Sequence, residues 1–257
     1  MEDSRQLPAA CSVIIIAGDE EHNILPCLAS VSWAAERIVV CSSRKDATEE
    51  LARSAATTVL YRDFDGYARQ KQFALEQATM EWVLSLDADE RATPELEREI
   101  RAIMADPAAR DGYSIPRKNH FGDTWLRHGG WYPDRQVRFF RRARTRVTDR
   151  LVHEGFEVTG SRGEIQAPML HYTLPRVRFF LGKALEYAWF EAREKRHRRK
   201  VGVGDFLVRP PLEFTKKYLL QRGFLDGWEG LVAAIIHVIS KVQVLLFLWE
   251  MQHRNRE

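Results

Sequence analysis

The sequence predicts an α/β fold, in which a parallel sheet carries helices on both faces and a helical segment follows. Three observations lead to this prediction: strand and helix signals alternate early in the chain, one strand ends in acidic residues, and the last part is helical. Alternation of this kind is typical of βαβ units with right-handed crossovers. At 257 residues the chain can hold one large or two modest domains with a buried core.

Each element of the alternating part has its own signal. Apolar and β-branched runs predict strands, whereas apolar residues at helical spacing predict helices. In chain order, the expected strands are 12–16, 37–40, 57–61 and 82–86, and the expected helices are 23–32, 47–56, 66–79 and 94–104. Beyond Asp111 two further strands are expected, 112–116 and 136–140, with a loop rich in glycine and aromatic residues between them at 119–134.

The strand at 82–86 runs directly into Asp87-Ala88-Asp89-Glu90. Acids are common at helix N-termini, but Thr93 followed by Pro94 already provides a cap and a first-turn proline for the next helix. Asp87 and Asp89 therefore precede the cap. Ligand groups gather at the carboxyl ends of strands in open α/β sheets, and carboxylates suit hard divalent cations. This Asp-x-Asp pair is a candidate metal site.

The composition favours a cytoplasmic protein. The three cysteines, Cys11, Cys27 and Cys41, lack metal-ligand spacing, so free thiols in a reducing compartment are expected. The first residues lack the basic-then-apolar pattern of a secretory signal. The net charge of +3 is small, although arginines crowd 135–150 and a basic block occupies 193–200. Because these stretches lack regular aromatic interleaving, nucleic-acid binding is disfavoured.

The run at 231–249 is apolar except for four residues that share one side of a helical wheel: His237, Ser240, Lys241 and Gln243. Its length would permit a membrane span, but a lysine near the middle would cost about 2.5–3.5 kcal/mol on insertion. Because basic residues precede it, we expect the helix to lie in the membrane interface. A core or dimer helix remains the alternative.

Several short motifs resemble family 2 glycosyltransferases with the GT-A fold and, more narrowly, bacterial lipopolysaccharide core biosynthesis glycosyltransferases. The motifs span most of the chain: SVIII at 12–16, EEHNI at 20–24, GYARQK at 66–71, LSLDADE at 84–90, GWYPDR at 130–135, VHE at 152–154 and GFLDGWEG at 223–230. The resemblance implies a Rossmann-like nucleotide-sugar-binding and catalytic domain at 1–165. A helical, basic and amphipathic membrane-associating extension would follow at 166–257.

The resemblance also implies a metal-dependent reaction. Mg²⁺ or Mn²⁺ held by Asp89 and His153 would stabilise the diphosphate leaving group, with Asp87 near the nucleotide ribose. Asp134 would be the catalytic base that takes the proton of the acceptor hydroxyl. The alternatives are a structural role for His153 and a turn role for Asp134, which follows Pro133.

Contacts to the nucleotide or the phosphates are implied for Glu20, Cys41, Lys71, Asp87, Arg135 and Arg138. Two departures from the family pattern are present. Residues 17–19 replace the usual hydroxyl, basic and Asn residues before Glu20, and Cys41 stands where the family has an aspartate that reads the base. A thiol in place of that carboxylate removes a hydrogen-bond acceptor, which leaves the identity of the donor base open.

The function implied is that of an inverting glycosyltransferase. It would move a hexose from a nucleotide sugar to a lipid-linked glycan acceptor, such as lipopolysaccharide inner core, as a peripheral protein on the inner face of the cytoplasmic membrane. One alternative is a polyprenyl-phosphate glycosyltransferase with the same nucleotide domain. The other is a catalytically degenerate membrane-associated scaffold, for which Cys41 is the supporting feature.

Overall fold

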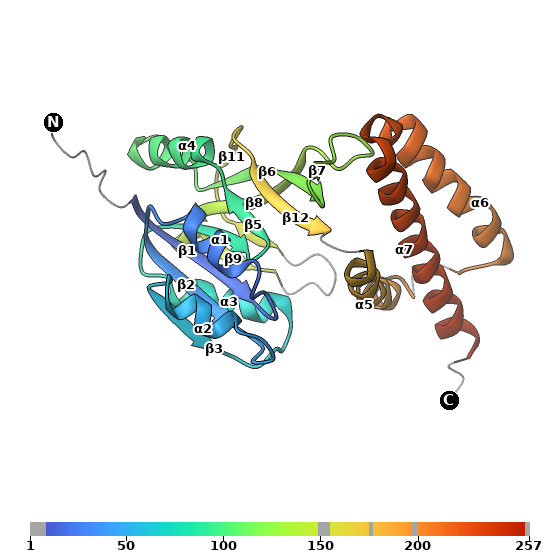
Figure 1. Ribbon diagram of the computed structural model, residues 1–257, viewed down its shortest axis with the longest axis horizontal. Coiled ribbons are helices and arrows are strands. Elements are labelled where there is room, and N and C mark those ends of the chain that lie inside the picture. The colour runs from blue at the N-terminus through green and yellow to red at the C-terminus, as the bar shows by residue number, and fades with distance from the viewer. Residues whose placement is uncertain (1–8, 149–154, 175–176, 197–199, 255–257) are drawn as a thin grey trace. The chain divides into compact units, whose positions relative to one another are not determined.

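The computed structural model describes residues 9–148, 155–174, 177–196 and 200–254 (Figure 1). These residues form two compact units. The sheet unit comprises 9–117, 135–148 and 155–171, and the helical unit comprises 118–134 and the described residues from 172 onward. The sequence placed the boundary after residue 165; in the structure the sheet unit continues to His171, and the glycine- and aromatic-rich loop belongs to the helical unit.

Parallel strands form the first half of the sheet, in the spatial order β3-β2-β1-β4. They are β1 (Ala9–Ala17), β2 (Ala34–Cys41), β3 (Thr58–Tyr61) and β4 (Trp82–Asp87). The intervening helices are α1 (Ile24–Ser30), α2 (Thr48–Arg53) and α3 (Tyr67–Gln77). The predicted alternation of strand and helix is therefore confirmed, and with it the α/β class.

The second half of the sheet is mixed, because β8 (Asp134–Arg141) pairs antiparallel with β4. The order then continues through β6 (Gly112–Phe121), β12 (Met169–Leu174) and β5 (Glu90–Ala92), while β7 (Thr124–Trp125) and β11 (Arg162–Glu164) also pair with β6. A separate two-stranded sheet consists of β9 (Thr145–Val147), which follows the short turn η1 (Arg142–Arg144), and β10 (Phe156–Val158).

Both faces of the parallel strands are buried, which explains the nearly continuous apolar sequence of β1. Val13 and Ile15 pack on one face with residues of α1 and α4 (Pro94–Ala105). Ile14, between them, packs on the other face with Ala74 and Leu75 of α3. This alternation is the two-residue period of a strand, and it places a helical layer on each side of the sheet.

Helix α4 begins as the sequence predicts. The Thr93 hydroxyl accepts a hydrogen bond from the backbone amide of Leu96 at 3.2 Å, with Pro94 at the first helical position. Strand β5 lies between this cap and the two aspartates. Asp87 and Asp89 therefore end a strand and enter a turn, and neither serves as the cap of α4.

The helical unit contains α5 (Val177–Lys195), α6 (Val203–Phe214) and α7 (Gly227–His253). A π-helical turn (η2, Thr215–Leu220) and a 3₁₀ turn (η3, Gly223–Asp226) join α6 to α7. Small residues of α5 pack against α7 in a cluster that includes Ala188, Ala192, Val244, Leu245 and Leu248. By length and composition, Gly223–His253 could cross a membrane, with a mean hydropathy of 2.2.

The polar face of α7 points into the helical unit. Lys241 Nζ lies 3.3 Å from the carboxylate of Glu191 on α5, and His237 Nε2 lies 3.2 Å from Glu213 Oε2 on α6. Two of the polar residues that share one side of α7 therefore pair inside the helical unit, and the membrane position of α7 stays a prediction. A charged group on an otherwise apolar helix is stabilised by acids on neighbouring helices, and these acids could not be identified from α7 alone.

Candidate active site

The site lies where the parallel strands of the sheet unit end. Asp87, the last residue of β4, is level with Ile16 of β1, and Ala17 of β1 is level with Cys41 of β2. Three carboxyl ends therefore share one edge of the sheet. This is the edge at which open α/β sheets bind their ligands.

Asp87 lies between two cations. Its carboxylate is 3.3 Å from Lys71 Nζ on α3 and accepts a 2.6 Å hydrogen bond from Arg138 Nη2 on β8. Burial alone would raise the pKa of Asp87, but Arg138 and Lys71 hold it well below its usual value of 3.8. Asp87 is therefore ionised at neutral pH, and 29% of its side chain remains exposed. The structure thus brings together three residues that the sequence singled out separately.

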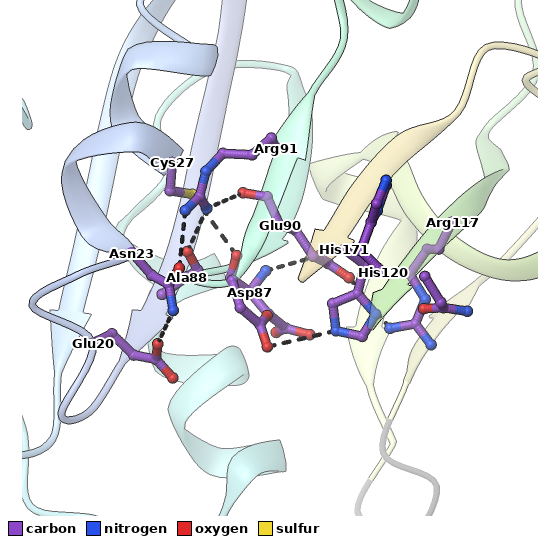
Figure 2. A network of polar contacts seen from close by, with 12 residues as sticks. Glu20, Asn23, Cys27, Asp87, Ala88, Glu90, Arg91, Arg117, His120 and His171 are labelled. Carbon is purple, nitrogen blue, oxygen red and sulfur yellow. Dashed lines mark hydrogen bonds and ion pairs between the residues drawn. The ribbon is translucent and has the colours of Figure 1, made fainter. Parts of the chain in front are cut away.

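Glu90 anchors this cluster from below. It is fully buried and accepts from Arg138 at 2.9 Å and from Arg117 of β6 at 3.2 Å. Its other oxygen accepts from the Asp87 amide at 2.9 Å (Figure 2). Burial would lower the pKa of Arg138, but Asp87 and Glu90 raise it. Sequence reasoning gave Glu90 and Arg117 no role, because only the pairing of distant strands makes them neighbours.

A second network fixes the turn between the two aspartates. Arg91 donates to the carbonyl oxygens of Ala88 at 2.7 Å and Glu90 at 2.8 Å, and to the Asn23 side-chain oxygen at 3.1 Å. Asn23 in turn donates to Glu20 at 2.8 Å (Figure 2). Glu20, a predicted substrate-binding residue, is thereby connected to the Asp-x-Asp turn.

Asp89 has a histidine beside it that the sequence did not reveal. Strand β12 pairs antiparallel with β5 and places His171 opposite Glu90. His171 Nε2 then lies 3.5 Å from Asp89 Oδ2. The sequence had assigned the histidine of this site to His153, which lies outside the described residues.

Asp89 and His171 fit a divalent cation. A carboxylate oxygen with an imidazole nitrogen suits Mn²⁺, whereas Mg²⁺ prefers oxygen alone. Within the described residues, no group of three or more acidic, histidine or cysteine side chains gathers as a metal-binding set. These two side chains would therefore hold the ion together with substrate phosphates and water. Asp87, by contrast, has its carboxylate engaged by Lys71 and Arg138.

Three other residues that the sequence predicts to bind substrate are buried or hydrogen-bonded within the sheet unit. Cys41 is fully buried in the core, which raises the pKa of its thiol to about 11. Arg135 donates to the Ile165 carbonyl at 2.9 Å and to Gln166 at 3.1 Å, so it fastens the segment that follows β11. Arg138 is 5% exposed and bonded to acids. Their roles in binding substrate stay predictions.

Asp134, the predicted base, belongs to the helical unit. Asn119 is 2% exposed, donates to the Trp131 carbonyl at 2.8 Å and lies 3.3 Å from the Asp134 carboxylate. One buried amide thus connects the two ends of the loop. Nothing in the sequence distinguished Asn119, because an asparagine at the start of a loop is ordinary turn chemistry.

The same loop is attached to the turn that precedes α7. The amide and the Nδ1 atom of His128 contact the Asp226 carboxylate at 2.8 and 2.7 Å. Gly129 donates to the Gln221 carbonyl at 2.8 Å, and Lys217 donates to the Gly129 carbonyl at 3.0 Å. The residues just before the GWYPDR motif are thus bonded to Asp226 of the GFLDGWEG motif and to the turn before it.

We expect His128→Ala and Asp226→Ala to be coupled. The Asp226 side chain is only 4% exposed, so removing either residue leaves the other without its charge-assisted hydrogen bond. A double-mutant cycle on the free energy of unfolding should give a coupling of about 0.5–3 kcal/mol. The control pairs His128→Ala with Glu250→Ala, an exposed acid on α7, which should be additive. Additivity in the first cycle would show that this contact does not hold the loop.

This chain is similar to several known proteins. The model of the family named Glycosyl transferase family 2 matches residues 12–159. The lipopolysaccharide core biosynthesis glycosyltransferase LpsC of Rhizobium meliloti (strain 1021) is 26% identical over 245 residues, which cover 88% of this chain and 89% of LpsC. A Rickettsia felis (strain URRWXCal2) protein named as an uncharacterized glycosyltransferase is 33% identical over 244 residues, covering 90% of this chain and 86% of that protein.

Among solved structures, S. aureus TarS 1-349 is similar with a TM-score of 0.48 and 15% identity, covering 96% of this chain and 92% of that one. The family match is more informative, since it includes β1, the Asp87–Glu90 turn and the strands that supply Arg117 and Arg138. The predicted resemblance and the predicted GT-A nucleotide-sugar-binding domain with a helical extension are confirmed. The chain belongs to glycosyl transferase family 2.

Proposed function

We propose that this glycosyltransferase moves a hexose, with inversion, from a nucleotide sugar to a lipid-linked glycan such as lipopolysaccharide inner core, at the inner face of the cytoplasmic membrane. Family membership and the name of the similar LpsC protein support the reaction class and the acceptor. The observation that carries the proposal is the acidic turn at the end of β4. There the Asp87 carboxylate forms ion pairs with Lys71 and Arg138, and Asp89 is paired with His171.

The donor would bind at this turn. Asp89 and His171 would hold Mn²⁺ or Mg²⁺, which supplies Lewis-acid stabilisation to the leaving diphosphate. Lys71 and Arg138 keep Asp87 ionised and fix its orientation. Its exposed part can therefore accept hydrogen bonds from ribose hydroxyls, which two oxygens on a carboxylate can do at once.

The acceptor would be activated by Asp134. As the acceptor hydroxyl oxygen forms its bond to the anomeric carbon, the hydroxyl proton passes to the Asp134 carboxylate. The bond between the anomeric carbon and the diphosphate oxygen breaks, and its electron pair leaves with the diphosphate. A single displacement from the opposite face inverts the anomeric configuration. Asn119 would hold the carboxylate in place through its 3.3 Å contact.

We expect Asp89→Ala to abolish metal-dependent donor binding while the fold is retained. A panel of nucleotide sugars, screened by thermal shift with Mn²⁺ and Mg²⁺, would first identify the donor, since a bound ligand raises apparent stability. Calorimetry with that donor and Mn²⁺ then compares wild type, Asp89→Ala and the control Asp106→Ala, an exposed aspartate at the end of α4. Unchanged donor affinity in Asp89→Ala would refute the metal assignment.

His171→Ala makes this test more specific. Because imidazole is a better ligand for Mn²⁺ than for Mg²⁺, loss of His171 should weaken donor binding more strongly in Mn²⁺ than in Mg²⁺. Circular dichroism of each variant checks that the sheet is intact. Equal losses in the two metals would assign His171 a structural role beside Asp89.

A further inference from the structure

The helical unit exposes many apolar side chains along α6, η2, η3 and the first turn of α7. We call this stretch, residues 203–228, the tip segment. Its exposed apolar residues are Val203, Leu207, Val208, Pro211, Leu212, Leu219, Leu220, Phe224, Leu225 and Trp228. Exposed apolar side chains that gather on the surface of a soluble protein commonly serve an interaction.

The arrangement on α6 is regular. Val203, Leu207 and Pro211 follow one another at four-residue spacing, which places them on the same helical face. Val208 and Leu212 form the adjacent row. Val203 and Leu207 are 77% and 70% exposed, as fully as Leu220 and Trp228 farther along, at 75% and 76%. Since Phe206 packs inward against the helical core, α6 has a buried face and a separate apolar outer face.

The acidic and basic side chains of the tip segment differ in their exposure. Each of its three acids is paired: Asp205 with Arg209 of the same helix, Glu213 with His237, and Asp226 with His128. Its exposed charged side chains are all basic, namely Arg209, Lys216 and Arg222. The outer face is therefore apolar with a cationic border, which is the combination that binds an anionic lipid surface.

We propose that the tip segment inserts into the headgroup region of an anionic bilayer and anchors the protein there. A second copy of the chain fits this face less well. A symmetric dimer would use the same patch twice and so bring two sets of exposed cations, Lys216 and Arg222, to one interface. Trp228 favours the lipid surface, because tryptophan is enriched at membrane–water interfaces. Helix α7 keeps its packing role, because its Lys241 and His237 remain paired with Glu191 and Glu213.

The anchor would also bring the loop that ends at Asp134 close to a lipid-linked acceptor, an inference that rests on the proposed function. Turns η2 and η3, which insert, also hold the loop that ends at Asp134, through Lys217, Gln221 and Asp226. Insertion of these turns would keep that loop at the level of lipid headgroups. A glycan linked to lipid presents its first sugars at this level.

The test uses the full-length protein and cosedimentation with vesicles of phosphatidylglycerol and phosphatidylethanolamine, compared with phosphatidylcholine. Leu207→Asp/Leu220→Asp should lower the partition coefficient on anionic vesicles more than tenfold. The matched control is Ile239→Asp/Leu246→Asp, two exposed apolar residues of α7, which should change it less than twofold. Point variants are needed because truncation before α7 would remove the core helix of the unit.

Charge reversal tests the cationic border. Lys216→Glu/Arg222→Glu should weaken binding to anionic vesicles at low salt by about fivefold for each cation removed. The same variant should bind phosphatidylcholine as the wild type does. High salt should release the wild type only in part, because apolar insertion is insensitive to salt.

Three outcomes would overturn the proposal: a wild-type protein that does not bind anionic vesicles, loss of binding only in the α7 variant, or a dimer in light scattering that Leu207→Asp/Leu220→Asp dissociates. Donor binding, measured on the same samples, separates this inference from the proposed function. Vesicle binding without binding of any nucleotide sugar would refute the proposed function alone. Donor binding without vesicle binding would refute the anchor alone.

Discussion

Asp134→Asn should bind the sugar donor as tightly as the wild type and lose transfer by about 10²–10⁴-fold, the usual scale for removal of a general base. Asparagine has the shape of aspartate and keeps an oxygen for the Asn119 amide, which lies 3.3 Å from the carboxylate. The loop should therefore keep its conformation. What asparagine cannot do at neutral pH is accept the proton of the acceptor hydroxyl.

The measurement is donor affinity by calorimetry together with transfer to a lipid-linked glycan acceptor. Asp123→Asn is the matched control, since it makes the same substitution at an exposed position of the same loop and should transfer normally. A parallel loss of donor affinity in Asp134→Asn would assign Asp134 to binding. Wild-type turnover would move the role of the base elsewhere, with Glu154, outside the described residues, as the next candidate.

Arg138→Met should destabilise the fold by about 3–5 kcal/mol, because it removes one partner of a buried ionic cluster. Arg138 is 5% exposed and bonds both Asp87 and Glu90 through Nη2. Methionine fills similar volume without charge, so both carboxylates lose a cation. Lys71, 3.3 Å from Asp87, and Arg117, 3.2 Å from Glu90, remain as cations beside the cluster.

The effect should depend on pH. The pKa of Asp87 in the folded protein is below its usual value of 3.8, so its ion pairs stabilise the fold fully above that pH. This stabilisation is lost as the pH falls through the folded-state pKa. The difference in unfolding free energy between wild type and Arg138→Met should thus be largest near neutral pH and shrink below pH 3.8.

Urea denaturation at a series of pH values measures this difference. Arg146→Met is the matched control, because Arg146 pairs with Glu157 on the surface, with 75% of the arginine side chain exposed. It should cost much less, as is usual for exposed ion pairs. Equal losses in the two variants would show that the Asp87 cluster contributes no more to stability than a surface pair.

The sequence by itself determined the elements of the sheet unit and the position of the acidic turn. Strand and helix periods, and the Thr93 cap, are signals between residues close together in the chain, so they can be read without knowing what packs against them. Asp87 could be placed at the end of a strand for this reason.

Only the tertiary structure decided what surrounds that turn. His171 meets Asp89 because β12 returns to pair with β5, and Arg138 reaches Asp87 and Glu90 because β8 lies antiparallel beside β4. Likewise, the polar side of α7 faces acids of α5 and α6, although its pattern alone is equally typical of a helix on a membrane. Strand pairing and helix packing bring together residues that are distant in sequence. The periodicity of a sequence shows which faces are apolar or polar, but it carries no information on which partner each face will meet.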